Sequence, residues 1–244
     1  MTTLARPIAL AAAAALLFTA LPAVAQESPA VGEVPGAFGG GSWSFQAGAF
    51  SDYRSKGASK TGGDPYAYGA VEWASASDVF YAGAEVSNIE SSTGADTEIE
   101  LAVGYRPEAF GYNWDFNAAH KSYLGARPGQ EDQAWEFTSD VSRSIGPASG
   151  RLRFQYSPDS AGSTRSWTWV EARAGWKFTP DFRTTAAIGR REQVNGVDYT
   201  AWNIGATYRV NDNLDFDVRW YDTSEDGRSP TYDSQLVAGF NVYF

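Results

Sequence analysis

The last nine residues, 236–244, read LVAGFNVYF and alternate along their length. An alternation of period two is typical of a β-strand whose two faces meet different surroundings. A bare aromatic at a chain end is unusual in a soluble protein, because chain ends are normally polar and frayed. It fits the closing strand of a membrane β-barrel, where outward residues meet lipid. The alternative is the last strand of a soluble sandwich. One parity of the stretch holds Leu236, Ala238, Phe240, Val242 and Phe244.

The first 25 residues have the pattern of a secretory signal peptide. Arg6 precedes an apolar run from Ile8 to Ala20, and Ala23-Val24-Ala25 forms a small-x-small cleavage site. The run is too short for a membrane-spanning helix. We therefore expect three parts: a signal peptide at 1–25, a flexible periplasmic leader at 26–41 and an outer-membrane β-barrel at 42–244.

Composition excludes several classes of function. The chain has no cysteine and one histidine, which argues against disulfides, a lipidated N-terminus, a metal site and any cofactor held by thiolates or imidazoles. Its formal net charge is −10, and cleavage after Ala25 removes Arg6 but no acidic residue. This balance argues against nucleic-acid binding, which needs a basic face. Aromatic residues make up 15% of the chain and there are 25 glycines, a mixture that suits a β-protein with aromatic girdles and many turns.

Alternating segments follow one another from Trp43 to the end of the chain. In the clearest of them, Ile99, Leu101, Val103 and Tyr105 alternate with Glu98 and Glu100. The pattern predicts an all-β, up-and-down antiparallel transmembrane barrel of about twelve strands, each near the ~10 residues that cross a membrane. A fifth strand is expected over Tyr112 to His120, followed by a polar connection from Lys121 to Asp132.

The connections between these segments alternate between long and short. The long ones are 54–64, 88–96, 121–132, 157–166, 192–198 and 222–233. Barrels of this kind have short periplasmic turns and longer outside loops, so both chain ends are expected on the periplasmic side. Outward aromatics near strand ends are expected in the interfacial girdles: Trp43, Trp73, Tyr105, Tyr112, Trp135, Tyr208 and Trp220.

The inward parity divides by charge. Strands two to six carry acidic residues there: Glu72, Glu85, Glu98, Glu100, Asp115, Glu136 and Asp140. Strands seven to ten carry basic ones: Arg151, Arg153, Arg173, Lys177, Arg183 and Arg209, with Glu171 as an exception. In a water-filled lumen, two such walls produce a transverse field that favours small polar or charged solutes. In a narrow barrel the same residues can instead form ion pairs that close the interior.

The segment Trp43 to Pro65, WSFQAGAFSDYRSKGASKTGGDP, resembles the opening of the TorF family of predicted porins from the proteobacterial outer membrane. The phrase FYAGAEVSNI (Phe80 to Ile89) and the segment from Glu100 to Tyr105 are also similar to that family. The resemblance implies a porin and supplies no substrate. Phe240, Val242 and Phe244 resemble the signal that the bacterial outer-membrane assembly machinery recognises. The expected partners are thus outer-membrane lipid, that machinery and small polar solutes; no oligomeric state is predicted.

Two other functions are consistent with the sequence. His120 and Ser122 lie two apart, a spacing similar to the His-x-Ser of outer-membrane phospholipase A, in which His is the base and Ser the nucleophile. Such a site needs a third group to orient the His, and Asp132 or Gln133 is the candidate; the flanking sequence does not match. The other possibility is a non-conducting structural or adhesive barrel whose loops bind a partner. We expect no catalytic site.

Overall fold

The computed structural model describes residues 34–35, 40–162 and 164–244. They form a closed antiparallel barrel of 12 strands, as the alternation predicts. The predicted signal peptide and most of the predicted leader lie outside the described residues. The barrel strands are β2 (Ser42–Phe50), β5 (Tyr66–Ala74), β6 (Phe80–Asn88), β7 (Thr97–Tyr105), β9 (Tyr112–Leu124), β10 (Gln133–Ile145), β11 (Ala148–Ser157), β12 (Trp167–Lys177), β13 (Phe182–Gln193), β14 (Tyr199–Asn211), β15 (Leu214–Thr223) and β16 (Gln235–Tyr243).

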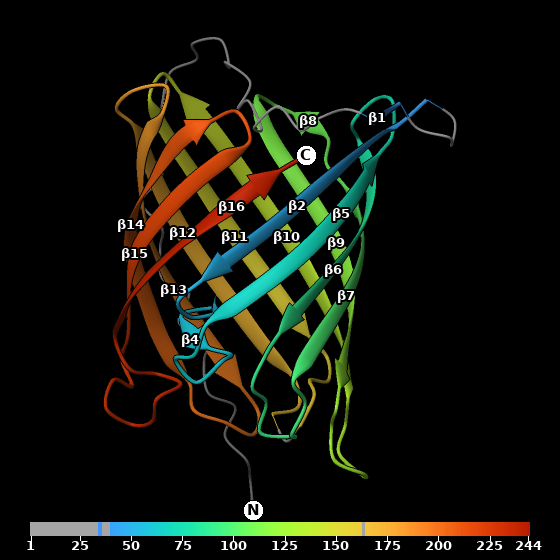
Figure 1. The fold of residues 1–244 in the computed structure, drawn as a ribbon, viewed down its shortest axis with the longest axis vertical. Helices are drawn as coiled ribbons and strands as arrows, with labels where there is room; N and C mark the ends of the chain where they lie inside the picture. The colour runs from blue at the N-terminus through green and yellow to red at the C-terminus, as the bar shows by residue number, and fades with distance from the viewer. Residues whose placement is uncertain (1–33, 36–39, 163) are drawn as a thin grey trace, which may run out of the picture.

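Each barrel strand pairs with the next one along the chain, and β16 pairs with β2 to close the ring (Figure 1). Two short strands extend this sheet: β1 (Val34–Pro35) pairs with β2, and β8 (Glu108–Ala109) pairs with β9. A separate hairpin, β3 (Arg54–Ser55) and β4 (Ala58–Ser59), lies within the first connection. Within the described ranges, no helix is long and apolar enough to cross a membrane.

The closing seam brings the terminal strand against the first one. Residues Gln46 to Phe50 oppose Gly239 to Tyr243, and the Phe244 amide donates to the Phe45 carbonyl at 2.9 Å. A Cβ at Gly239 would come within 2.2 Å of the Phe50 ring, so only glycine permits this approach. Closure leaves no free sheet edge on the barrel.

Long and short connections lie at opposite ends of the barrel. The connections 51–65, 89–96, 125–132, 158–166, 194–198 and 224–234 share one end, which we call the loop end. The connections 75–79, 106–111, 146–147, 178–181 and 212–213 share the other, which we call the turn end. The C-terminus lies at the turn end (Figure 1). The predicted alternation of connection lengths is therefore present in the structure.

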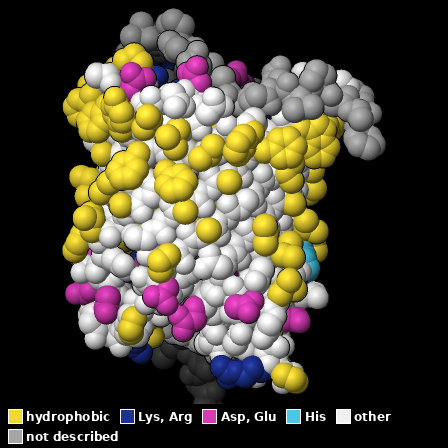
Figure 2. All heavy atoms as spheres, in the orientation of Figure 1, with side chains coloured by type: hydrophobic (Ala, Val, Ile, Leu, Met, Phe, Trp, Pro, Cys, Tyr) yellow, Lys and Arg dark blue, Asp and Glu magenta, His cyan; other side chains and the backbone are white. Residues whose placement is uncertain are grey.

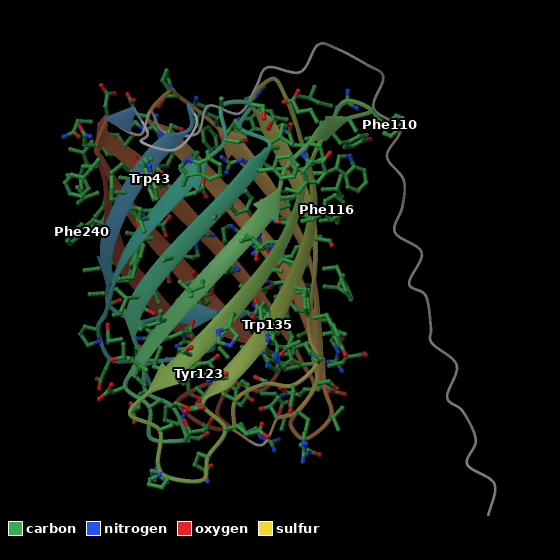
Figure 3. All side chains as sticks on the ribbon, turned by 90° about the vertical axis from the view of Figure 1, so that its right-hand side faces the viewer. Trp43, Phe110, Phe116, Tyr123, Trp135 and Phe240 are labelled. Carbon is green, nitrogen blue, oxygen red and sulfur yellow. The ribbon has the colours of Figure 1, made fainter. Side chains whose placement is uncertain are left out.

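Apolar side chains cover the outer wall (Figure 2). Leu101, Val103 and Ile204 are more than half exposed, at 55%, 59% and 61%. Large apolar side chains exposed in such number belong in lipid and not in water. Trp43, Phe116 and Phe240 lie toward the turn end and Trp135 toward the loop end (Figure 3), so large aromatics flank the wall on both sides.

The predicted end of the fifth barrel strand is wrong, and it differs most from the structure. The fifth barrel strand does not end at His120, because β9 continues to Leu124 and only 125–132 form the connection. Lys121 opposes Glu100 and Tyr123 opposes Glu98 in the ladder with β7, and Lys121 is only 6% exposed. A charge that marks a strand end in a soluble sheet is an ordinary inward residue in a barrel with a polar interior.

Candidate channel lumen

A row of charged side chains runs around the inner wall at mid-height. Asp115, Asp140, Arg153 and Glu171 oppose one another in turn on β9, β10, β11 and β12. Arg153 binds Asp140 through Nη2 at 2.6 Å and Nε at 2.8 Å. Arg151 binds Glu171 at 2.7 Å. The predicted acidic and basic residues therefore meet as ion pairs between β10 and β12.

The hairpin β3–β4 folds into the barrel and does not extend outward from it. Its turn residues, Lys56 and Gly57, both have positive φ, at 54° and 82°, as a two-residue type I′ turn requires. A Cβ at Gly57 would lie 2.2 Å from the Ala201 Cβ on β14. The tip of the hairpin is therefore packed against the inner face of β14, away from the two strands that it connects.

Polar and aromatic contacts hold the tip in place. The Lys56 ammonium lies 3.0 Å from Glu136 on β10 and 4.4 Å from the centre of the Trp167 ring on β12. Ala58 packs on a buried cluster formed by Trp167, Trp169, Tyr199 and Ala201. Because β10 and β12 lie across the ring from β2 and β5, the hairpin spans the lumen.

The base of the hairpin is anchored by Arg54, whose side chain is 1% exposed. Its guanidinium binds the buried carboxylate of Asp52 and donates to the Asp233 carbonyl at 2.8 Å and to Gln235 at 2.6 Å. Asp52 also accepts hydrogen bonds from Ser59 and Thr61. These contacts join the first connection to the last one at the loop end.

Three lysines and three glutamates form a charge-balanced group, which we call the hairpin lock: Lys56, Lys60, Lys121, Glu98, Glu100 and Glu136. Lys121 lies 2.7 Å from Glu100, 3.3 Å from Glu98 and 3.9 Å from Glu136. Lys60, which directly follows β4 of the hairpin, also binds Glu98. The lock therefore joins the hairpin to β7, β9 and β10 and neutralises much of the predicted acidic wall.

Burial changes the acidity of two residues of the first connection. It lowers the pKa of Lys56 to about 8, although Glu136 opposes the shift. Burial also raises the pKa of Tyr53 to about 12. Desolvation disfavours the charged form in both cases. The lock thus contains a lysine that loses its proton more readily than a solvated one.

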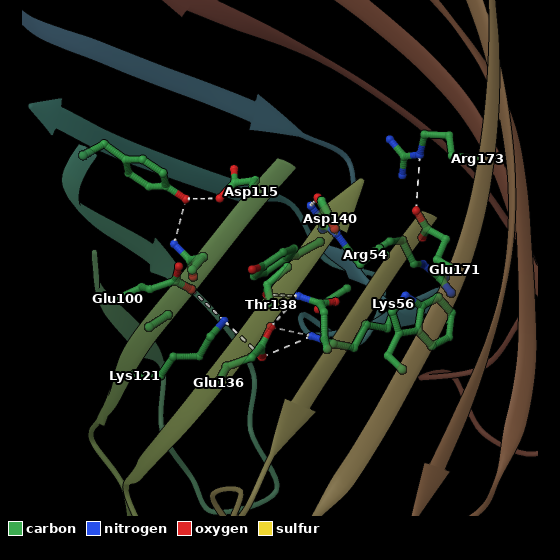
Figure 4. Close-up of a pocket in the computed structure, with 18 residues that line it drawn as sticks. Arg54, Lys56, Glu100, Asp115, Lys121, Glu136, Thr138, Asp140, Glu171 and Arg173 are labelled. Carbon is green, nitrogen blue, oxygen red and sulfur yellow. Dashed lines mark hydrogen bonds and ion pairs between the residues drawn. The ribbon is translucent and has the colours of Figure 1, made fainter. Parts of the chain in front are cut away.

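A polar cavity of about 400 Å³ remains beneath the hairpin. Four of the predicted acidic residues line it, Glu100, Asp115, Glu136 and Asp140, together with the predicted basic residues Arg153 and Arg173. The hairpin contributes Arg54 and Lys56, and Tyr53, Tyr81 and Trp169 add aromatic surface. Figure 4 shows Asp115 and Glu100 on one side of this cavity and Arg173 on the other.

The other predicted lumen residues lie away from this cavity. Glu72 binds Arg106 at 2.9 Å near the turn end, and Glu85 opposes Glu100 in the sheet. Arg183 and Arg209 share the buried carboxylate of Asp215, at 4.0 Å and 3.3 Å. Lys177 opposes Arg183 and is exposed. We call Lys177, Arg183, Arg209 and Asp215 the turn-end group.

Sequence reasoning missed the hairpin and its lysines. The two walls were assigned from strand parity alone, which says nothing about a connection that folds back inside. One signal was present: Gly57 stands between two short polar segments, and glycine readily takes the positive φ that the second position of a type I′ turn requires. Lys121 was missed because it was placed in a loop.

The structure does not assemble a hydrolytic triad around His120. The His120 ring meets the Trp135 ring edge-on, with centroids 4.9 Å apart. Across 40–162 and 164–244, no hydrogen bond joins the His120 side chain to Ser122, Asp132 or Gln133. In the same part of the chain, no three His, Cys, Asp or Glu side chains are grouped as metal ligands.

A closed antiparallel barrel with an apolar outer wall and a charged interior defines the class of outer-membrane β-barrels. Within that class, the chain belongs to the Gcw_chp family, described as bacterial proteins of unknown function, whose model matches residues 36–240. The resemblance to the TorF family stays a prediction. No curated protein matches the sequence.

Solved structures of porins and channels share the fold. The KdgM porin superposes with a TM-score of 0.59 at 10% identity, over 82% of this chain and 99% of that one. The NanC porin gives 0.54 at 10% identity, over 83% and 98%. The COG4313 outer membrane channel from Pseudomonas putida F1 gives 0.53 at 9% identity, over 90% and 100%. At such low identity the likeness establishes the fold alone.

Proposed function

We propose that this protein is an outer-membrane channel through which small polar or charged solutes diffuse passively. One observation carries the proposal: a polar cavity of about 400 Å³ lies inside a closed barrel whose outer wall is apolar. Porins and channels of the same fold support it. The barrel then spans the bacterial outer membrane, with the turn end in the periplasm and the loop end outside.

The lumen is narrow because the hairpin crosses it. The hairpin contacts β10, β12 and β14, so solutes pass beside it and through the cavity lined by Glu100, Asp115, Arg153 and Arg173. Charged side chains on both sides make entry costly for apolar solutes. Phe240, Val242 and Phe244 serve as the assembly signal, and the bilayer and the assembly machinery are the partners. We assign no cofactor and no catalytic activity.

Conductance in a planar lipid bilayer tests the proposal. The refolded mature protein should give discrete current steps, because one barrel forms one aqueous path. Replacing Arg151 and Arg153 by glutamine leaves Glu171 and Asp140 with less compensation, so the cation-to-anion permeability ratio should rise by up to about fivefold, the equivalent of ~1 kcal/mol. A folded, heat-modifiable barrel that never conducts would show that the protein is a structural or adhesive barrel.

The phospholipase alternative is tested separately. Because His120 packs on Trp135 and makes no hydrogen bond to Ser122 in the described chain, Ser122→Ala should leave lysophospholipid release from mixed micelles at the level of the unchanged protein. A loss of release in this variant would establish Ser122 as a nucleophile.

A further inference from the structure

Asp115 lies on one side of the lumen cavity, and its carboxylate can accept more hydrogen bonds than it receives from the protein. Its Oδ1 accepts a hydrogen bond from the Tyr81 hydroxyl at 2.8 Å. Throughout the described part of the chain, no lysine or arginine nitrogen lies within 4.0 Å of this carboxylate. Glu100, on the neighbouring strand β7, lines the same side and is itself paired with Lys121. The β7–β9 side of the cavity thus offers one carboxylate that is not neutralised.

Arg173 lies on the other side of the cavity, and its positive charge is only partly compensated. Its Nε lies 3.4 Å from Glu171 but makes no hydrogen bond and is shielded from water. Glu171 is bound more closely by Arg151, at 2.7 Å, so a single carboxylate serves two guanidinium groups. The Arg173 side chain is 37% exposed. Its terminal nitrogens are therefore available to a solute in the cavity.

Between these two groups the wall is electrically balanced. Asp140 and Arg153 neutralise each other at 2.6 Å, and Lys56 and Lys121 compensate Glu136. The cavity therefore presents an unpaired carboxylate on β9 and, on β12, a guanidinium that shares its one carboxylate with Arg151; Figure 4 shows the two on opposite sides.

We infer that the channel favours zwitterionic solutes, such as short peptides with free amino and carboxyl ends. This inference rests on the proposed function and names the class of solute. A solute with one charge is attracted by one side and repelled by the other, and a neutral solute gains from neither. A zwitterion can place its ammonium toward Asp115 and its carboxylate toward Arg173 at the same time. Each such contact favours the solute by about fivefold in an aqueous lumen.

Flux into proteoliposomes with four probes of similar size tests the inference. The probes are glycylglycine as zwitterion, glycylglycinamide as cation, N-acetylglycine as anion and N-acetylglycinamide as neutral solute. Mass spectrometry measures the uptake of each, and each flux is divided by the neutral flux through the same protein. We expect glycylglycine to exceed the other two charged probes by roughly threefold to tenfold.

Single neutralisations should then change the preference in opposite directions. Asp115→Asn should shift it toward N-acetylglycine, and Arg173→Gln toward glycylglycinamide. Arg143→Gln is the matched control, because Arg143 lies on the outward parity of β10 over the Tyr112 ring. Passage of the neutral probe with no advantage for glycylglycine through the unchanged protein would overturn this inference and leave the channel intact. Failure of the neutral probe to pass would overturn the channel itself.

Discussion

The hairpin lock and the turn-end group both combine basic and acidic inward side chains, but they differ in burial and pairing. In the lock, the Lys121 side chain is 8% exposed and lies within 4.0 Å of three carboxylates. In the turn-end group, Lys177 is exposed, and Arg183, 49% exposed, reaches one carboxylate at 4.0 Å. Inward charged side chains therefore have two roles in this barrel. Those of the lock hold a connection in place inside the loop end, and those of the turn-end group form an accessible basic surface.

Stability should show the largest contrast between the two regions. Lys121→Met leaves Glu98, Glu100 and Glu136 with one cation fewer in a buried group, and breaking such a group costs about 3–5 kcal/mol. Lys177→Met is the matched control, with a change within about 0.5 kcal/mol because the side chain is exposed. Unfolding in urea, followed by loss of heat-modifiable mobility from detergent-folded protein, measures both. Equal effects would show that the lock is no more stabilising than the turn-end group.

The second largest effect should be a change in conductance when the hairpin is prevented from docking. Gly57→Val adds a branched side chain at a position of positive φ where even a Cβ would lie 2.2 Å from the Ala201 Cβ. The tip cannot then dock, so single-channel conductance should rise severalfold. Gly129→Val is the control, since Gly129 also has a positive φ, of 84°, but nothing lies within 4 Å of its Cβ position. An unchanged conductance in Gly57→Val would mean that the hairpin does not limit flow.

Most of the barrel was predictable, because parity is a local property that lipid enforces. Leu236 and Phe240 are exposed and Val237 is buried, as the alternation of the last strand predicts. The same rule placed Glu98 and Glu136 on the inward face. The contact between Lys56 and Glu136, 80 positions apart, is a long-range one that no periodicity encodes. The sequence therefore predicts the two charged walls of the site, but it does not predict the hairpin that bridges them.

The smallest expected effect is a pH dependence confined to the lock. Burial lowers the pKa of Lys56 to about 8; Glu136 opposes this, and Lys121, Arg191 and Lys60 add to it. The ordinary pKa of a lysine is 10.5. Between pH 8 and pH 10.5, Lys56 is therefore less protonated in the docked hairpin than in a released one, and the docked state becomes more stable as pH rises. Below pH 8 Lys56 is charged, and the desolvation cost of burying that charge fully opposes docking. Alkaline conditions therefore remove one positive charge from the lumen without releasing the hairpin.

From pH 7 to 9.5 we accordingly expect the cation-to-anion permeability ratio to rise by about twofold to fivefold, with no increase in conductance. Tyr53 does not contribute, because burial raises its pKa to about 12. Lys56→Met should make the ratio insensitive to pH over this range, and Lys177→Met should retain the response of the unchanged protein. Reversal potentials in a salt gradient, read together with step size, separate selectivity from gating. If conductance instead rises steeply above pH 8, the charge on Lys56 is what holds the hairpin, and loss of that proton opens the channel.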